Sequence, residues 1–227
     1  MKCNHKICVA ALFFAVSITA CTNQTTTVTN NDSLPAAPEN NTASSREASM
    51  MESINAMLNN MKNTTLVNDF DHDYATLIIT HDQAAVELSE MELAKGTDTA
   101  MKAIAQTMVA DHKAEIEVLK SFLMHHDDKA ADAGIDATKH THPNGIHTEL
   151  ADDLMAMAEK FNAVKATNNA DMDYASLMVI QHEMGIKMAK DHLTHGHHAD
   201  LRKISQKAVD EDMAEVGKFR TWLAGKK

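Results

Sequence analysis

The sequence predicts an all-α protein: a four-helix bundle built from two duplicated helical hairpins, with short accessory helices. Composition is the first reason, because the 227 residues include only seven glycines and three prolines, and aromatic residues make up 4%. Residues that favour helices, such as alanine, methionine, leucine, glutamate and lysine, are abundant instead. The second reason is an internal repeat, and the third is the spacing of apolar residues within each copy.

The repeat becomes visible when the sequence is shifted by 100 positions. The stretch YATLIITHDQAAVELSEMEL, which begins at Tyr74, then meets YASLMVIQHEMGIKMAKDHL, which begins at Tyr174. No gap is needed, so the phase of each helix is kept, which favours a duplicated unit over chance identity. The two units cover residues 49–125 and 149–225. Further identical pairs are Asp71 and Asp171, Asp73 and Asp173, Gly96 and Gly196, Ile104 and Ile204, Glu115 and Glu215, and Leu123 and Leu223.

Each unit reads as a short helix, a long helix, a turn at Gly96 or Gly196, and a second long helix. Steps of three and four residues separate the members of two inward stripes. These are Tyr74, Leu77, Ile78, His81, Ala85 and Leu88, and then Met101, Ile104, Met108, His112, Ile116, Leu119 and Leu123. Two such hairpins form a four-helix bundle with pseudo-twofold symmetry. We expect the short helices, near residues 49–63 and 148–164, on its outside or at its ends.

The amino-terminal residues read as an export signal. The stretch MKCNHKICVAALFFAVSITAC contains two lysines, an apolar run from Ile7 to Ile18 that is too short to span a membrane, and then small residues. Its end resembles a lipobox, so we expect Cys21 to be lipidated and to become the first residue of the mature protein. The alternative is an ordinary signal peptide with an incidental cysteine. The first interpretation predicts a lipid-anchored protein of the cell envelope, on its periplasmic or outer-membrane face.

The predicted organisation has five parts. They are a lipoprotein signal peptide (residues 1–20), a disordered tether (21–47), a first helical repeat (48–126), a histidine-rich linker (127–147) and a second helical repeat (148–227). The tether is rich in threonine, asparagine, serine and proline and lacks the apolar residues of a core. The formal net charge of −11 argues against a nucleic-acid partner. Since none of the three cysteines follows Cys21, a metal site in the repeats would use histidine, methionine or carboxylate ligands.

Polar residues interrupt the apolar stripes at matching levels of the two repeats. His81 has Gln181 as its counterpart, with His182 beside it. In the second long helix His112 has Asp212 as its counterpart, and one turn later a glutamate is kept in both copies. A buried carboxylate needs a charged partner or a metal ion. Two interpretations therefore stay open: a metal site, or histidine–glutamate hydrogen bonds that need no metal.

Two motifs in each unit resemble the bacterial "domain of unknown function 305" family. The early family motif is D-x-x-[FY]-x-x-M-[IM]-x-H-H-x-x-A-I-x-M-A, which the residues from Asp71 and from Asp171 follow. The late motif, Q-x-x-E-I-x-x-M-x-x-W-L, is followed around Glu115 and Glu215. The resemblance implies a ferritin-like helical bundle in an exported protein, and some members are implicated in copper binding. A second resemblance, to the "domain of unknown function 4142" family, rests on MVADHKAEIEVLK.

The chain departs from the family motifs at the residues that would carry a site. The double histidine of the early motif is His81-Asp82 in one copy and Gln181-His182 in the other. A ferritin-like bundle also suggests a di-iron centre, but that chemistry uses Glu-x-x-His, which does not occur in this sequence. No glycine-rich phosphate loop, serine-centred elbow or cysteine–histidine pair is present. We therefore expect no ferroxidase and no other enzyme, and no organic cofactor.

Histidines also crowd the linker and the second hairpin turn, where the sequence reads DHLTHGHH. Imidazole suits copper and zinc, and the thioethers of the sixteen methionines suit copper(I). The predicted function is binding or buffering of a transition metal, copper first and zinc second. The alternative is a metal-free structural or interaction module, whose protein partner the sequence does not name. The candidate ligands are His81, His112, Glu115, His182, Met188, His192, His195, His197, His198 and Glu215.

Overall fold

The structure is a computed structural model, which describes residues 42–67, 69–133 and 146–226. Side chains are described for residues 50–67, 69–126 and 153–226. The predicted signal peptide, Cys21 and most of the predicted tether and linker lie outside the described residues. No helix among the described residues has both the length and the apolar character needed to cross a membrane.

Six helices make up the secondary structure of the described residues, which confirms the all-α prediction. They are α1 (Thr42–Asn63), α2 (Phe70–Lys95), α3 (Thr99–Ala133), α4 (Ile146–Asn162), α5 (Ala170–His195) and α6 (Ala199–Ala224). Helices α2 and α3 form one hairpin, and α5 and α6 form the other. Glycine ends the first long helix of each hairpin, since Gly96 caps α2 and Gly196 caps α5.

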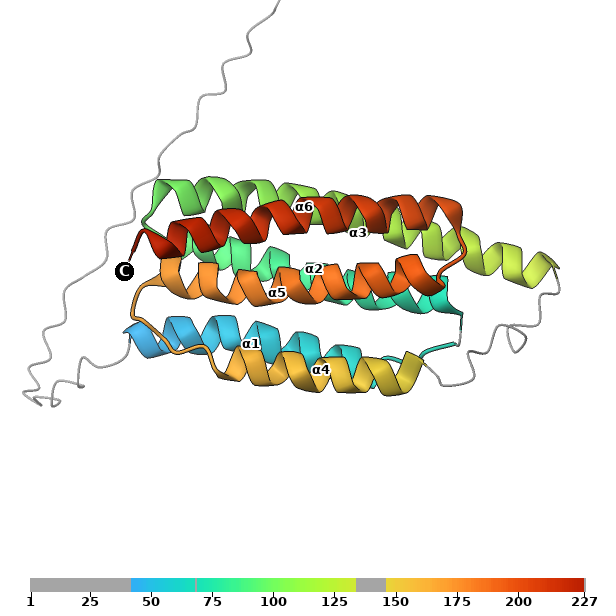
Figure 1. The fold of residues 1–227 in the computed structure, drawn as a ribbon, viewed down its shortest axis with the longest axis horizontal. Helices are drawn as coiled ribbons and strands as arrows, with labels where there is room; N and C mark the ends of the chain where they lie inside the picture. The colour runs from blue at the N-terminus through green and yellow to red at the C-terminus, as the bar shows by residue number, and fades with distance from the viewer. Residues whose placement is uncertain (1–41, 68, 134–145, 227) are drawn as a thin grey trace, which may run out of the picture. The chain divides into compact units, whose positions relative to one another are not determined.

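The helices stack in three layers, as Figure 1 shows. Helices α2 and α5 form the middle layer, with α3 and α6 on one side and α1 and α4 on the other. The accessory helices thus cover the outer face of α2 and α5. Three helices exceed the predicted boundaries: α1 begins within the predicted tether at Thr42, α3 continues past residue 126 to Ala133, and α4 begins within the predicted linker at Ile146.

The accessory helices complete the apolar core. Helix α1 contributes Met50, Ile54 and Met61, whose side chains are almost fully buried, and α4 contributes Phe161. These side chains join a cluster with Leu88 of α2 and other apolar residues of α3, α5 and α6. Methionine is frequent here because its flexible side chain fills irregular gaps between helices. Burial of such side chains, at about 25 cal/mol per Å² of apolar surface, is the main stabilising term.

An aspartate at the start of α5 holds the hairpin turn of the first repeat. The backbone N–H groups of Thr97 and Asp98 both donate to Asp171 Oδ1 at 2.8 Å. The hydroxyl of Thr97 donates to Asp171 Oδ2 at 2.9 Å. Because these donors follow the end of α2 and precede α3, one carboxylate fixes the turn between the two helices of the other repeat.

Asp71 of the first repeat makes the equivalent contact with the hairpin turn of the second repeat. The backbone N–H groups of His197 and His198, in the turn between α5 and α6, donate to the Asp71 carboxylate at 3.1 Å. His192 Nε2 adds a third hydrogen bond to Asp71 Oδ1 at 2.8 Å. Although burial opposes it, hydrogen bonding to His192 and to the turn lowers the pKa of Asp71 to about 2. Each repeat therefore holds the hairpin turn of the other through an ionised carboxylate.

Replacing either aspartate should destabilise the whole bundle, because the N–H groups of a hairpin turn would lose their charged acceptor. We expect Asp71→Ala and Asp171→Ala each to lower the free energy of unfolding by about 3 kcal/mol, since hydrogen bonds to charged groups contribute about 1.5–3 kcal/mol each. Urea denaturation followed by circular dichroism measures this. The control is Asp210→Ala, an exposed aspartate of α6. Equal stability of Asp71→Ala, Asp171→Ala and the control would contradict the role of the carboxylates.

Candidate metal centre

Six titratable side chains form two clusters between the middle layer, α2 and α5, and the layer of α3 and α6. The first cluster is Asp82 of α2 with His112 and Glu115 of α3, and the second is His182 of α5 with Asp212 and Glu215 of α6. Within each cluster, one ligand atom from each residue lies within 4.8 Å of the others. Each set therefore offers one imidazole nitrogen and two carboxylate oxygens to a shared point.

The two clusters are related by the internal repeat, but with an exchange of residues. Adding 100 to the number of Asp82 gives His182, and adding 100 to the number of His112 gives Asp212. The glutamates match directly. The histidine and the aspartate have thus changed places between the two helices of a hairpin, and each cluster keeps the composition of one histidine, one aspartate and one glutamate.

Gln181 orients the histidine of the second cluster. Its side-chain N–H donates to the backbone carbonyl of His81 at 3.0 Å, so its own oxygen faces His182. His182 Nδ1 then donates to Gln181 Oε1 at 3.0 Å. This leaves His182 Nε2 directed at Glu215, whose Oε2 lies 2.9 Å away. A hydrogen bond that fixes the tautomer of one ring nitrogen and directs the other toward a centre is typical of metal-binding histidines.

The first cluster contains buried polar atoms without hydrogen bonds. His112 Nδ1 lies 3.3 Å from Asp82 Oδ1, close enough for an ion pair. Among the described side chains, His112 Nδ1 and Asp82 Oδ2 are nonetheless buried atoms that make no hydrogen bond, and so is His81 Nδ1. An unsatisfied buried polar atom costs about 1–3 kcal/mol, so Asp82 Oδ2 and His81 Nδ1 are available to a ligand, whereas His112 Nδ1 already faces Asp82.

The clusters adjoin one another inside the bundle. The rings of His112 and His182 meet edge to face, with their centroids 6.0 Å apart. Gly185 of α5 lies between Asp212 and the His81 ring, because a Cβ atom there would come within 2.8 Å of Asp212 Oδ2 and 3.0 Å of His81 Nε2. The equivalent residue in the first repeat is Ala85. His81 therefore joins the edge of the same polar region.

Burial and mutual repulsion shift the pKa values of this region. Burial raises the pKa of Asp212 to about 6, although His182 and His112 oppose the shift. Burial and the nearby Asp82 carboxylate also raise the pKa of Glu115. Burial would lower the pKa of His112, but the attraction of Asp82 overcomes it and raises that pKa to about 9. Burial and the neighbouring histidines hold the pKa of His81 well below its usual value, so His81 is neutral.

These shifts show how the region balances its charge without a metal ion. Protons on His112, and in part on the carboxylates, reduce the repulsion among the four acidic groups, of which Asp82 is buried and the other three are partly buried. A divalent cation would replace those protons, because metal ligands bind in their deprotonated forms. Imidazole nitrogen and carboxylate oxygen suit first-row divalent metals. The donor set therefore fits a transition-metal ion.

The histidines of the second hairpin turn do not gather into a comparable set among the described residues. His192 is fully buried, and it spends both ring nitrogens on hydrogen bonds to Asp71 and Ser205. His195 packs its ring against Phe70 at 5.2 Å between centroids. His197 is exposed, and His198 Nδ1 accepts from the N–H of Leu201 as the cap of α6. Here the histidines of the turn act first as structural groups.

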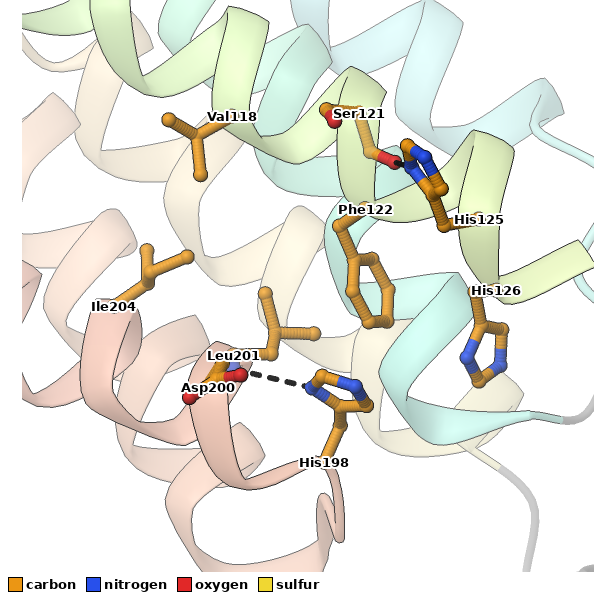
Figure 2. Close-up of a pocket in the computed structure, with 9 residues that line it drawn as sticks. All are labelled: Val118, Ser121, Phe122, His125, His126, His198, Asp200, Leu201 and Ile204. Atoms are coloured by element: carbon orange, nitrogen blue, oxygen red, sulfur yellow. Dashed lines mark hydrogen bonds between the residues drawn. The ribbon is translucent and has the colours of Figure 1, made fainter. Parts of the chain in front are cut away.

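One of them takes part in a surface pocket between α3 and α6, which Figure 2 shows. His198 forms its lower rim, and His125 and His126 of α3 lie on the opposite side, with Phe122 between them. His125 Nδ1 donates to the carbonyl of Ser121 at 2.6 Å, which leaves its Nε2 lone pair available. The pocket has a cavity volume of about 420 Å³. The pocket therefore contains three imidazoles, at the end of the bundle, that belong to neither cluster.

Many of the described methionine side chains pack in the apolar core. Met108, Met178 and Met184 are buried among apolar side chains. Met188, a predicted ligand, is partly buried and packs against both apolar clusters of the bundle. The linker residues His140 and His142 lie outside the described residues. Of the predicted ligands, the structure brings His112 together with Glu115, and His182 together with Glu215, and places His81 beside them.

Comparison with known proteins identifies the family. The family model described as Domain of unknown function (DUF305) matches residues 18–123 and again residues 112–223. The chain belongs to the DUF305 family. The prediction made from the two motifs is therefore confirmed, and so is their occurrence in two tandem copies. No significant match was found among curated proteins.

Solved structures support the same fold for this DUF305 protein. It resembles CopM in the apo form and in the silver-bound form obtained by co-crystallization, each with a TM-score of 0.50 and 21% identity. It also resembles CopM with silver introduced by soaking, with a TM-score of 0.50 and 19% identity. Each match covers 68% of this chain and 96% of CopM. At this identity the likeness concerns the helical bundle, and neither the family description nor these structures name an enzymatic activity.

Sequence reasoning missed three residues of the centre: Asp82, Asp212 and Gln181. The signal was present in the repeat, because the exchange of Asp82 for His182 is matched by the exchange of His112 for Asp212. Two reciprocal changes that preserve one composition indicate that the four residues share a site. The alignment of His81 with Gln181 does not by itself reveal the exchange of Asp82 for His182.

The metal-free protein should lose stability as the pH rises. Asp212 and His112 have higher pKa values in the folded protein than their ordinary 3.8 and 6.5, so the folded state binds their protons more tightly. The stability gained is present below the ordinary pKa and is lost as pH rises, from 3.8 to about 6 for Asp212 and from 6.5 to about 9 for His112. Urea denaturation with a chelator present, across this pH range, measures the decline.

The variant Asp212→Asn removes one titrating group and should flatten the profile between pH 3.8 and about 6. The matched control is Asp210→Asn, an exposed aspartate on the same helix, which should keep the wild-type profile. A wild-type profile that is flat over the whole range, or one that rises with pH, would show that the buried groups do not retain their protons.

Proposed function

We propose that this chain is an exported lipoprotein that binds or buffers a transition-metal ion, copper first and zinc second, in the bacterial envelope. The observation that carries the proposal is the pair of clusters inside the bundle, each with one histidine and two buried or partly buried carboxylates within 4.8 Å. Such groups are costly to bury and are normally paired or bound to metal. The envelope location rests on the export signal and the lipobox-like sequence that ends at Cys21.

The metal-free alternative predicts that every central histidine is satisfied by a carboxylate. His182 meets that expectation, because it hydrogen-bonds to both Gln181 and Glu215. In the first cluster His112 Nδ1 lies 3.3 Å from Asp82 Oδ1, but Asp82 Oδ2 is buried without a hydrogen bond. A cation beside this carboxylate would satisfy that oxygen. The unsatisfied oxygen therefore favours metal binding over a purely structural role.

The ligand atoms favour copper(II) and zinc(II). Nitrogen and oxygen sites generally bind copper(II) most tightly among the first-row divalent ions, and they also accept zinc(II). Each cluster contains one imidazole and two carboxylates, a donor set that suits divalent ions better than the thioethers preferred by copper(I). CopM, which shares the fold, is described in silver-bound forms, so the bundle architecture is compatible with metal binding.

In this proposal the pocket of His125, His126 and His198 is an outer metal-binding site. It lies at the end of the bundle, where its imidazoles are partly or fully exposed. Exposed imidazoles bind and release metal ions readily, whereas a buried centre retains them. In this proposal the outer histidines capture an ion weakly, and the buried carboxylates and histidines hold it. Buffering or handover to another envelope protein follows from that difference in affinity.

The test is a titration of the chelator-treated protein with copper(II) and with zinc(II), followed by calorimetry. We expect tight, saturable binding, with copper bound more tightly than zinc. The double variant Glu115→Gln/Glu215→Gln keeps the shape of both clusters and removes two ligands, and it should weaken binding by at least about 100-fold, the loss expected for disturbing a metal site. Elemental analysis after desalting measures the retained metal independently.

The matched control is His195→Ala/His197→Ala, which removes two imidazoles of the hairpin turn and leaves both clusters intact. It should bind metal as the wild type does. If this control loses tight binding while Glu115→Gln/Glu215→Gln keeps it, the site lies at the hairpin turn. If the wild type binds neither copper nor zinc tightly, the proposed function is wrong and the metal-free module takes its place.

Fatty-acid labelling tests the predicted lipid anchor at Cys21. Cys21 is expected to carry lipid, so the wild-type protein should be found in the membrane fraction and should incorporate a labelled fatty acid. Replacing it by serine, Cys21→Ser, should abolish the label. Cys8→Ser, which alters a cysteine inside the expected signal peptide, is the control and should leave labelling unchanged. Labelled Cys21→Ser protein would contradict the lipobox interpretation.

A further inference from the structure

We propose that the two clusters form one dinuclear centre that holds two divalent metal ions in a single chain. This inference rests on the proposed function and goes beyond it, because metal buffering requires only one ion. The geometry that carries it is the contact between the clusters, in which the rings of His112 and His182 lie 6.0 Å apart. Each cluster supplies its own histidine, aspartate and glutamate.

Each cluster is a separate set of ligands. Asp82, His112 and Glu115 converge from α2 and α3, whereas His182, Asp212 and Glu215 converge from α5 and α6. Three protein ligands suffice for a transition-metal ion whose remaining positions are filled by water or by a bridging group. Because neither set borrows a residue from the other, occupancy of one does not remove a ligand from its neighbour.

Charge balance also favours two ions. The centre contains four carboxylates, Asp82, Glu115, Asp212 and Glu215, which carry four negative charges when ionised. One divalent ion would leave two of these negative charges uncompensated inside the bundle, and two divalent ions would compensate all four. Uncompensated buried charge is costly, so neutrality stabilises the second ion once the first is bound.

The composition matches that of known two-metal bundles. Ferritin-like carboxylate proteins use four carboxylates and two histidines in the bundle core, with Glu-x-x-His on two of the helices. This chain places the same number of each ligand type on four helices, but with the order His112-x-x-Glu115 on α3 and Asp212-x-x-Glu215 on α6. The motif Glu-x-x-His is absent because α3 has the reversed order His112-x-x-Glu115, and because the histidine of the second cluster, His182, lies on α5 and not on α6.

Unsatisfied buried atoms are the independent observation that points to a ligand. Asp82 Oδ2 in the first cluster, and His81 Nδ1 beside the centre, make no hydrogen bond among the described residues. Gly185 lets Asp212 Oδ2 and His81 Nε2 approach the α5 backbone closely, because a Cβ atom there would come within 2.8 and 3.0 Å of them. The unsatisfied atoms therefore lie in and beside the first cluster, and the close approach at Gly185 brings the second cluster next to them.

The number of ions per chain tests the inference. The probes are zinc(II) and copper(II), added to the full chain after chelator treatment, and native mass spectrometry counts the ions that remain bound. We expect two equivalents per chain. With copper(II), electron paramagnetic resonance should show a magnetically coupled pair, with a signal weaker than that of two isolated ions.

Two isosteric variants assign the ions. Asp82→Asn removes a ligand of the first cluster, and Asp212→Asn removes one of the second, so each should bind one ion and give the signal of an isolated copper(II). Gly185→Ala retains every ligand but brings a methyl group within 2.8 Å of Asp212 Oδ2, and it should weaken the second cluster at least about tenfold. The control His125→Ala/His126→Ala removes the outer pocket and should still bind two ions.

The outcomes separate this inference from the proposed function. One tightly bound ion in the wild type, lost equally in Asp82→Asn and Asp212→Asn, would overturn the dinuclear centre and leave the proposed function in place. A second ion that disappears in His125→Ala/His126→Ala would also overturn it, because that ion belongs to the outer pocket. Absence of any tightly bound ion would overturn both.

Discussion

The carboxylates of Asp71 and Asp171 connect the two repeats, and the arrangement of the bundle depends on them. Each lies in the first turn of a middle-layer helix and accepts hydrogen bonds from the hairpin turn of the other repeat. This contact sets how far α3 and α6 are displaced along α2 and α5. The levels at which His112 meets Asp82, and His182 meets Asp212, follow from that register. A slip of one helical turn, about 5.4 Å, would separate these groups entirely.

The polar centre opposes the folding that the apolar layers drive. Four acidic groups and three histidines lie inside the bundle, where burial raises the pKa of Asp212 and Glu115 and lowers that of His81. The folded protein meets this cost with the methionine-rich core that α1 and α4 complete. A third layer of helices is thus more than a cover, because a bare four-helix bundle would have less apolar burial to offset its polar interior.

Much of the fold could be predicted from the sequence because duplication and helical spacing are local or periodic signals. Gly96 and Gly196 mark the two turns, and the stripes through Leu88 and Leu119 mark the buried faces. The centre was harder to predict. Asp82 looks like an ordinary polar residue beside His81 when one repeat is considered alone, and its exchange for His182 is informative only beside the exchange of His112 for Asp212. Its distance of 3.3 Å from His112 on another helix shows its role directly. His192 shows that a histidine-rich surrounding is a weak signal by itself, since both ring nitrogens of this residue hydrogen-bond within the protein, to Ser205 and Asp71.

The exchange of histidine and aspartate between the repeats has a consequence for symmetry. Two identical chains that associate about a twofold axis must present chemically identical halves, since each residue appears at both positions. The two repeats of a single chain can differ in sequence, and in this chain they differ at the residues of the centre. His182 is held by Gln181 through one ring nitrogen, whereas His112 faces Asp82 with no such support. The two halves of the centre are therefore equal in composition and unequal in rigidity, a distinction that no symmetric pair of single repeats could maintain.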